Sequence, residues 1–259
     1  GAGANTFNEV FGATLNPWDT TKSCAGSSGG SAVALATGQA WIASGSDLGG
    51  SLRNPASFCS VVGLRPSPGR VAYGATGEGA FPADLFGIPG QPFSVAGPMA
   101  RNVSDVALLL DAMVGHHPRD PISLPRTTTS YIDAVKSRTK PKKVAFSRDL
   151  GVTPVDPAVA DICEKAAKRF EQLGCIVEEA HPDFSDVQDI FQTWRAMSFY
   201  VGKKSLLDTN KDLLKPEVVW NIEQAAAITV DDFARVELAR ARYLDRAVTF
   251  FEEYDLLLS

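Results

Sequence analysis

The sequence predicts an α/β fold built from layers of helices and strands. Stretches whose apolar residues recur at helical spacing alternate with short apolar runs typical of strands, and this alternation indicates a layered α/β architecture. The composition also divides the chain, because residues 1–100 hold 18 of the 22 glycines but only 9 of the 55 charged residues. We therefore expect loops and buried strands around a site in residues 1–100, and amphipathic helices with a few strands in residues 101–259.

Three segments combine helical periodicity with residues that begin or end helices. A Ser, Asp or Thr before the periodic stretch supplies a side-chain oxygen for the first free backbone amides, and a glycine ends two of the stretches. The first expected helix is 105–114, with Ser104 as its N-cap and Gly115 at its end. The second begins at Asp156 and ends at Gly174. The third begins with Thr229 and Asp232, which have the spacing of a capping box, and runs through about residue 253.

Short apolar runs between these segments predict strands. A run of small residues, 32–38, precedes the first of them. The expected strands are 39–43, 144–146, 175–177 and the C-terminal run 255–259, which we expect to be buried.

The composition excludes several classes of protein. The net charge of −5 and the pI of 5.3 argue against a basic nucleic-acid binder. No apolar stretch approaches the roughly 20 residues that cross a bilayer, and no basic-then-apolar signal segment opens the chain. The four cysteines show no Cys-x-x-Cys spacing, so we expect neither structural zinc nor a disulfide scaffold, and we expect a cytoplasmic protein.

Both ends of the sequence differ from those of a typical complete chain. Residue 1 is Gly1 rather than Met, and the sequence stops inside the apolar run 255–259. Natural chains seldom end within a core element without a tail or a turn. We expect this sequence to be the middle of a longer protein.

The most informative stretch, 23–53, contains two Gly-Gly-Ser triplets. The first lies within residues 26–31, and the second, Gly49-Gly50-Ser51, follows 20 residues later. Glycine allows backbone N–H groups to converge on one point that side chains would otherwise obstruct. Such a loop ending on a serine suits an oxyanion hole beside a nucleophile, and it equally suits a bound phosphate.

Two alternative motifs fit this stretch less well. A phosphate-binding P-loop has Lys directly after its last glycine, whereas serine follows both Gly-Gly pairs here. Residues 26–30 match Gly-x-Ser-x-Gly, the nucleophile elbow of α/β-hydrolases, but a polar segment precedes them instead of a hydrophobic strand. The three histidines, His116, His117 and His181, lie in turns beside prolines, and we expect them to be exposed rather than catalytic.

The landmarks along the chain resemble those of the amidase signature family. The resemblance is carried by residues 26–31, by 45–59 (Gly-Ser-Asp-Leu-Gly-Gly-Ser-Leu-Arg-Asn-Pro-Ala-Ser-Phe-Cys) and by Val-Gly-Leu-Arg-Pro at 62–66. Further landmarks are Asn5, 11–12, 16–19, 96–101 and 254–258. They run from end to end of the chain, and the core signature is long and specific.

The resemblance implies a layered α/β/α fold with a central mixed, twisted β-sheet covered by helices and incomplete at both ends. It also implies a single amidase-signature domain fragment over 1–259. In that domain, 1–100 is the Gly-rich catalytic core and 101–259 is the helix-rich remainder.

The resemblance further implies a Ser–cis-Ser–Lys triad. Ser51 maps to the nucleophile, and Ser27, preceded by a cis peptide bond, maps to the bridging serine that relays a proton. The family's lysine base maps to a segment upstream of residue 1. Lys22 is the single lysine in the first 100 residues. It lies too close to Ser27 to be that base, and we expect it to be a surface charge.

Other positions of the family map onto the surrounding residues. We expect the acyl pocket to draw on 80–95 and 190–200, and Arg240 aligns with an arginine that holds the glutamine carboxylate in the tRNA-dependent branch. The resemblance implies no metal and no cofactor. It assigns the backbone N–H groups of Leu48, Gly49, Gly50 and Ser51 to an oxyanion hole, Ser28 to a supporting hydroxyl, and Asp47 and Arg53 to holding the nucleophile loop.

The implied function is an amidase that hydrolyses a carboxylic amide to an acid and ammonia or an amine, through an acyl-enzyme on Ser51. One alternative is the A subunit of a glutamyl-tRNA amidotransferase, which performs the glutaminase half-reaction. Another is an inactive fragment or a non-catalytic relative. The expected partner is a small-molecule amide, with no direct contact to nucleic acid or membrane, and a homodimer is left open.

Overall fold

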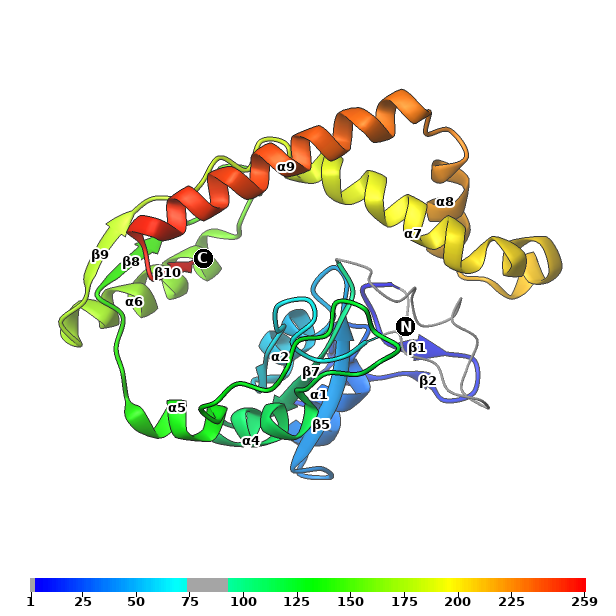
Figure 1. Cartoon of the computed structure of the whole chain (residues 1–259). Helices are drawn as coiled ribbons and strands as arrows, with labels where there is room; N and C mark the ends of the chain where they lie inside the picture. The colour runs from blue at the N-terminus through cyan, green and yellow to red at the C-terminus, as the bar shows by residue number, and fades with distance from the viewer. Residues whose placement is uncertain (1–2, 74–92) are drawn as a thin grey trace. The chain divides into compact units, whose positions relative to one another are not determined.

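The computed structural model describes residues 3–73 and 93–259 (Figure 1). The chain divides into two compact units. The first unit comprises Gly1–Arg138 and Ser198–Ile222, and the second comprises Thr139–Met197 and Glu223–Ser259. Each unit combines helices with a small sheet, which confirms the predicted α/β class. The single domain over 1–259 stays a prediction.

The first unit contains a three-stranded antiparallel sheet in the order β5-β7-β6. β5 pairs with β7 along its whole length, so that Asp47, the last residue of β5, lies opposite Val95. Residues 48–52 then connect β5 to α2 in a short turn. The strands are β5 (Ile42–Asp47), β6 (Val62–Gly63) and β7 (Val95–Ala100), and the helices that contact them are α1 (Gly29–Ala36), α2 (Arg53–Cys59) and α4 (Val103–Met113).

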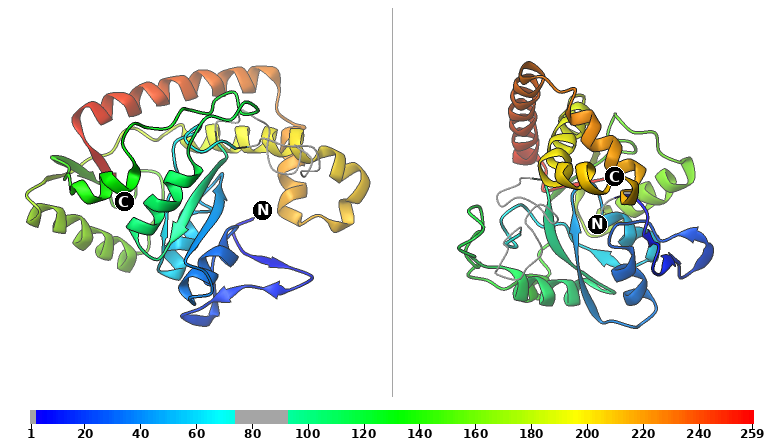
Figure 2. Two further views of the ribbon diagram at one scale, coloured as in Figure 1. Left: turned by 60° about the horizontal axis from the view of Figure 1, so that its bottom comes forward. Right: turned by 90° about the vertical axis from the view of Figure 1, so that its right-hand side faces the viewer.

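Short elements complete the first unit. Two antiparallel ribbons, seen in blue in Figure 2, pair β1 with β2 and β3 with β4. The segment Ser198–Ile222 adds parts of the helices α7 (Val187–Asn210) and α8 (Pro216–Ala225). The remaining elements are β1 (Phe7–Asn8), β2 (Gly12–Ala13), β3 (Leu15–Asn16), β4 (Asp19–Ser23), α5 (Tyr131–Ser137) and the 3₁₀ helix η1 (Lys211–Leu213).

One buried cluster lies behind both serine-bearing loops of the first unit. Cys24 comes three residues before Ser27 and Leu52 directly follows Ser51, and both anchors are fully buried. Because close-packed interiors resist displacement, this shared cluster fixes the two loops relative to each other. Its members are Cys24, Ala32, Leu35, Leu52, Ala56, Cys59 and Met99.

The second unit contains a parallel sheet in the order β10-β8-β9, with α6 packed against β8 and β9 (Figure 1). Trp194 of α7 packs on Phe233 of α9, with ring centroids 5.3 Å apart. Among the described residues, no helix combines the length and the apolar character that crossing a membrane requires. The elements are β8 (Lys143–Phe146), β9 (Ile176–Glu179), β10 (Leu256–Leu258), α6 (Pro157–Gln172) and α9 (Val230–Glu253), while α7 (Val187–Asn210) and α8 (Pro216–Ala225) are divided between the units.

Two of the three predicted helix starts are confirmed. The Asp156 side chain caps α6, and Thr229 and Asp232 form the capping box of α9. The prediction for α4 is wrong by two residues, because Asn102 rather than Ser104 accepts the capping hydrogen bond. Asn102 has the extended backbone that an N-cap adopts, whereas Ser104 already lies within the helix.

The predicted strands at 144–146 and 175–177 are confirmed as β8 and β9. The strand predicted at 39–43 is misplaced, because pairing with β7 shifts β5 by three residues at its start, and the small-residue run before it belongs to α1. The C-terminal run forms β10, but Leu256 is 39% exposed because β10 is an edge strand paired with β8. The expectation of a buried strand there is therefore wrong.

Candidate active site

Ser51 lies in the turn between β5 and α2, here called the nucleophile turn (residues 48–51). Leu52 follows it as the N-cap residue of α2 and is fully buried. Ser51 itself is half-buried and remains partly accessible. The strand on one side and the buried anchor on the other fix the backbone of the turn, which suits a residue that must meet a substrate in one geometry.

The carboxylate of Asp47 holds the nucleophile turn from inside. It is fully buried, and it accepts N–H groups from Gly50 at 2.8 Å and Leu52 at 3.1 Å. Arg53 adds two contacts of 3.0 Å to the same carboxylate. Burial alone would raise the pKa of Asp47, but the hydrogen bonds from Arg53, Gly50 and Leu52 and the charge of Arg53 lower that pKa to about 2. Asp47 thus contacts the turn directly and Arg53 contacts Asp47, while the holding role of both residues stays a prediction.

Sequence reasoning missed a second arginine at this carboxylate, Arg65. Its guanidinium donates to the backbone oxygen of Asp47 and lies 3.2 Å from Asp47 Oδ1, and its other nitrogen donates to Phe93 O at 2.6 Å. Arg65 therefore ties the end of β5 to the chain that enters β7. One feature of the sequence could have indicated this contact: Arg65 belongs to the 62–66 landmark and lies in a region with few charged residues.

The loop that carries Ser27 meets β5 and the nucleophile turn through its next residue. The peptide bond before Ser27 is cis, as the family resemblance implies. Ser28 Oγ lies 3.3 Å from both N and O of Ser46, and the N–H of Ser28 donates to Ser51 O at 3.3 Å. This approach requires glycine at Gly45, where a Cβ would lie 2.5 Å from Ser28 Oγ. The structure thus brings the two serine-bearing segments together.

Backbone amides of the nucleophile turn are available to a ligand. Within 3–73 and 93–259, the N–H groups of Leu48, Gly49 and Ser51 have no protein acceptor. Gly50 differs, because its N–H donates to Asp47 inside the unit. The Gly50 amide therefore fixes the turn, and the predicted oxyanion donors whose amides have no acceptor among the described residues are Leu48, Gly49 and Ser51.

The predicted acyl pocket is described in part. Its residues 80–92 lie outside the described residues. Leu48 of the nucleophile turn packs against a buried apolar cluster on α7 and α8, formed by Phe199, Val218 and Ile222. A buried apolar cluster therefore adjoins the turn, and Phe199 falls in the predicted range 190–200.

Two cationic side chains considered in the sequence analysis, Lys22 and Arg240, form ion pairs with carboxylates. Lys22 is exposed and pairs with Asp19 at 3.2 Å, as expected of a surface charge. Arg240, in the second unit, binds Glu237 through two contacts of 2.9 Å. The Arg240 guanidinium therefore forms an ion pair, and the carboxylate-binding role that the resemblance suggests for it stays a prediction.

The two cysteines nearest the serine loops, Cys24 and Cys59, do not compete with the serines as reactive groups. Burial raises the pKa of Cys24, and it raises the pKa of Cys59 to about 11, so both are thiols at neutral pH. His116, His117 and His181 are exposed, as predicted. In the described part of the chain, no three His, Cys, Asp or Glu residues gather as a metal site.

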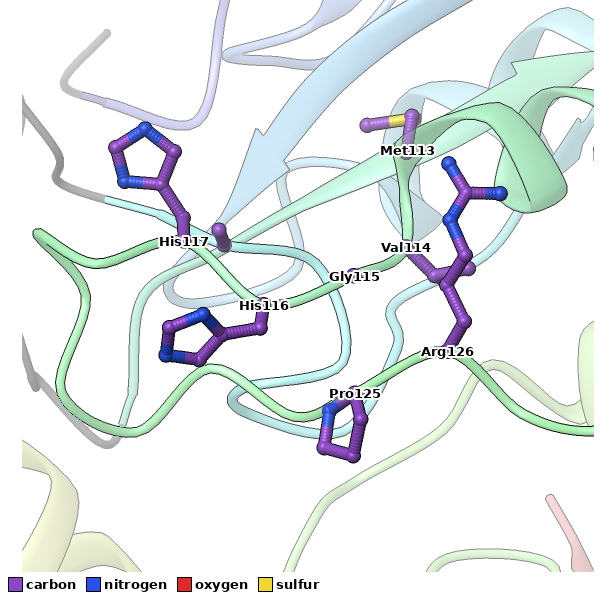
Figure 3. A pocket seen from close by; sticks show the side chains of 8 residues that line it. Met113, Val114, Gly115, His116, His117, Pro125 and Arg126 are labelled. Atoms are coloured by element: carbon purple, nitrogen blue, oxygen red, sulfur yellow. The ribbon is translucent and has the colours of Figure 1, made fainter.

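A cavity of about 440 Å³ elsewhere in the first unit lacks a nucleophile (Figure 3). Neither Ser27 nor Ser51 lines it. Its two histidines, His116 and His117, extend their rings in different directions from one loop, and His117 Nδ1 accepts the Arg119 N–H at 3.2 Å. The cavity therefore offers no nucleophile–base pair, and the two serine loops remain the candidate active site.

Replacing Asp47 with asparagine is expected to lower the free energy of unfolding by about 3 kcal/mol, the scale for breaking a buried ion pair. The asparagine has one acceptor oxygen where Asp47 serves two amides, and it leaves Arg65 without its charge partner. Urea unfolding of both proteins at pH 7 measures the difference. The matched control is Asp133→Asn, at a side chain that is 64% exposed, and its effect should stay within about 0.5 kcal/mol.

The same pair of proteins gives a pH dependence. The folded pKa of Asp47, about 2, lies below the ordinary value of 3.8, so its stabilisation is complete above the ordinary pKa and is lost as the pH falls toward the folded one. The stability gap between wild type and Asp47→Asn should narrow between about pH 4 and pH 2. A gap that stays constant over this range would contradict the ion-paired role of Asp47.

Comparison with known proteins places these motifs in context. The family model described as Amidase matches residues 1–259. An acylamidase of Rhodococcus erythropolis is 33% identical over 256 residues, which are 98% of this chain and 52% of that protein. The A subunit of the glutamyl-tRNA(Gln) amidotransferase of Moorella thermoacetica is 42% identical over 178 residues, covering 68% of this chain and 34% of that protein.

A solved structure of an amidase signature enzyme is also similar to this chain. The crystal structure of a bacterial aryl acylamidase of the amidase signature family superposes with a TM-score of 0.84 at 30% identity, covering 98% of this chain and 52% of that one. The chain thus spans about half the length of these acylamidase relatives.

Proposed function

The chain belongs to the amidase family, and from this premise we propose that it carries the serine nucleophile of an amidase that hydrolyses a carboxylic amide. The observation that carries the proposal is the nucleophile turn, where a buried carboxylate fixes the backbone beside Ser51 and other amides stay available. Ser28 joins this turn to the loop of Ser27. We further propose one amidase domain over 1–259.

In the proposed acylation step, Ser51 Oγ attacks the amide carbonyl carbon and forms a C–O bond. The Ser51 proton passes to Ser27, whose own proton passes to a neutral lysine base, because a serine hydroxyl is a weak nucleophile without such help. The base maps by resemblance to a lysine outside this sequence. The carbonyl electron pair moves onto oxygen, where the N–H groups of Leu48, Gly49 and Ser51 would stabilise the oxyanion.

Collapse of this intermediate breaks the C–N bond. The leaving nitrogen takes a proton returned through Ser27, and the acyl group remains as an ester on Ser51. Water then attacks the ester carbon while the same relay takes up its proton. The bond between the acyl carbon and Ser51 Oγ breaks, the relay returns the proton to Ser51 Oγ, and the acid is released. Each step places developing negative charge at the same oxygen, so one set of amides serves both halves of the reaction.

Labelling with a fluorophosphonate tests the proposal directly. We expect the probe to modify Ser51 in the protein that contains this chain, since the probe reacts with activated serine hydroxyls. Mass spectrometry of the modified peptide identifies the site, and an excess of an anilide substrate should slow the labelling. Folded protein that takes no label, or takes it at a serine other than Ser51, would reject this function and favour a non-catalytic relative.

The A subunit of a glutamyl-tRNA amidotransferase is the second candidate. The observation that favours it is the higher local identity, 42% over 178 residues, to a protein of that name. Similarity to the acylamidase covers more of the chain, 98% against 68%. Ammonia release from glutamine alone, together with a second protein chain that co-purifies, would favour the amidotransferase, whereas hydrolysis of anilides by the isolated protein would favour the acylamidase.

We expect the partner of this site to be a small-molecule amide. The half-buried apolar side chain of Leu48, which packs on the buried apolar cluster of α7 and α8, favours a substrate with an apolar acyl or amine group, since burial of apolar surface drives such binding. A cytoplasmic location and a homodimer belong to the same proposal. Fractionation of cells and the mass of the native protein in solution test these two points.

A further inference from the structure

We propose that Thr6 is a positioning residue for Ser27, through a hydroxyl that holds the backbone of the loop in which Ser27 lies. Neither the motifs nor the proposed reaction assigns a role to Thr6. The inference rests on the proposed function, because positioning has a catalytic meaning where Ser27 relays a proton.

The contacts of Thr6 carry this inference. Its Oγ1 lies 3.0 Å from Ala25 O and 3.4 Å from Ser27 O, so a single hydroxyl proton faces the carbonyls on both sides of Gly26. The backbone of Thr6 is held in turn by Thr14, whose N–H donates to Thr6 O at 2.9 Å. The hydroxyl is therefore presented to the loop from the residue directly before β1, where the backbone is paired with Thr14.

The packing around this hydroxyl is tight. At Gly29, the first residue of α1, a Cβ would lie 2.3 Å from Thr6 Oγ1 and 2.6 Å from Cys24 Sγ. Gly29 therefore packs closely against this hydroxyl. Cys24 Sγ also lies 3.3 Å from Ala25 O, so removal of the Thr6 hydroxyl leaves that carbonyl with a weak thiol donor and takes the Thr6 contact from Ser27 O. A partly buried carbonyl that loses its donor shifts or reorients to recover one.

Two hydroxyls hold this loop from opposite segments. Ser28 Oγ binds the backbone of Ser46 on β5, while Thr6 Oγ1 binds the carbonyls of Ala25 and Ser27 from the N-terminal segment. A relay serine must meet two partners at once, and misplacement by about 1 Å costs on the order of 100-fold in rate. Ser28 Oγ contacts β5, whereas Thr6 Oγ1 contacts the backbone oxygen of Ser27 itself, the residue proposed to relay the proton.

The test compares Thr6→Val, which removes the hydroxyl at constant shape, with Thr6→Ser, which keeps it. The protein that contains this chain is assayed with an aryl anilide and with an aryl ester of the same acyl group. We expect Thr6→Val to lower kcat for the anilide about 10- to 100-fold with KM within about threefold. Thr6→Ser should stay within about threefold of wild type.

The ratio of anilide to ester turnover separates positioning from loss of structure. An amine must be protonated as it leaves, whereas a phenolate leaves without a proton, so a misplaced relay costs the anilide more. We expect this ratio to fall about tenfold in Thr6→Val. The matched control is Thr37→Val, at the other end of α1, where the hydroxyl also donates to a backbone carbonyl, Val33 O, at 2.8 Å. That control should leave the ratio unchanged.

Each outcome decides the inference. An unchanged ratio in folded Thr6→Val overturns it, and so does an equal loss in Thr6→Ser. If the valine variant does not fold, Thr6→Ala, which removes the hydroxyl without placing a methyl against the carbonyls, is measured in the same way. Wild-type protein that hydrolyses neither substrate and takes no fluorophosphonate at Ser51 rejects the proposed function itself, whereas an active wild type with an unchanged ratio in Thr6→Val rejects the role of Thr6 alone.

Discussion

Replacing Ser51 with alanine is expected to lower kcat for an aryl anilide by about 10⁴- to 10⁶-fold, the scale for removal of a catalytic nucleophile. The hydroxyl is the atom that would form the acyl bond, so no partial reaction survives its loss. The fold should persist, because Ser51 joins the neighbouring loop through its backbone, where Ser51 O accepts the Ser28 N–H. Steady-state kinetics and a urea unfolding curve measure the two effects.

A second serine near Ser51 provides the control for this substitution. Ser57 is exposed on α2, six residues farther along the chain, and Ser57→Ala should leave kcat within about twofold of wild type. Retention of more than about a tenth of the wild-type rate in Ser51→Ala would reject Ser51 as the nucleophile, because nucleophile removal costs orders of magnitude more. A variant that loses both activity and unfolding free energy would instead assign a structural role to the hydroxyl.

The parts of the fold that could be predicted are those set by local chemistry. Thr229 and Asp232 satisfy the first amides of α9 through contacts three residues apart, so adjacent sequence is sufficient. The start of α4 was predicted two residues too late, because Asn102 and Ser104 are both capping residue types and the backbone conformation selects Asn102. β5 was misplaced because its Gly and Ser residues have low strand propensity, and its limits are set by pairing with β7.

In the candidate site, too, the contacts between residues close in sequence were predictable and those between distant residues were not. The Gly-Gly-Ser triplets mark the two loops, the family resemblance assigns Ser51 and Ser27 within them, and the contact of Asp47 with Arg53 spans six residues within one landmark. Arg65 and Thr6 were missed because their partners lie 18 and 19 residues away in sequence, across elements whose arrangement is known from the structure. A single arginine or threonine carries no pattern of its own, so contacts of this kind become visible once the chain is folded.

Replacing Ser27 with alanine is expected to lower kcat for the anilide by about 10²- to 10⁴-fold, the range for loss of general acid–base assistance. The nucleophile Ser51 remains in place, so the loss should be smaller than that of Ser51→Ala. Labelling of Ser51 by the fluorophosphonate should slow as well, because its proton has lost the path to the base. Stopped-flow measurement of acylation with an aryl ester resolves this step from deacylation.

The control for Ser27 is Ser31→Ala, four residues farther along. Ser31 lies on α1, and its hydroxyl contacts β5 by donating to Ser44 O at 3.0 Å. If the relay role is correct, Ser27→Ala slows acylation while Ser31→Ala does not, and the unfolding free energies of the two variants stay similar. A normal acylation rate in Ser27→Ala would remove the relay role and leave Ser51 dependent on a base that reaches it directly. That result would also reject the positioning role proposed for Thr6, because the loop that Thr6 holds would contain no residue that relays a proton.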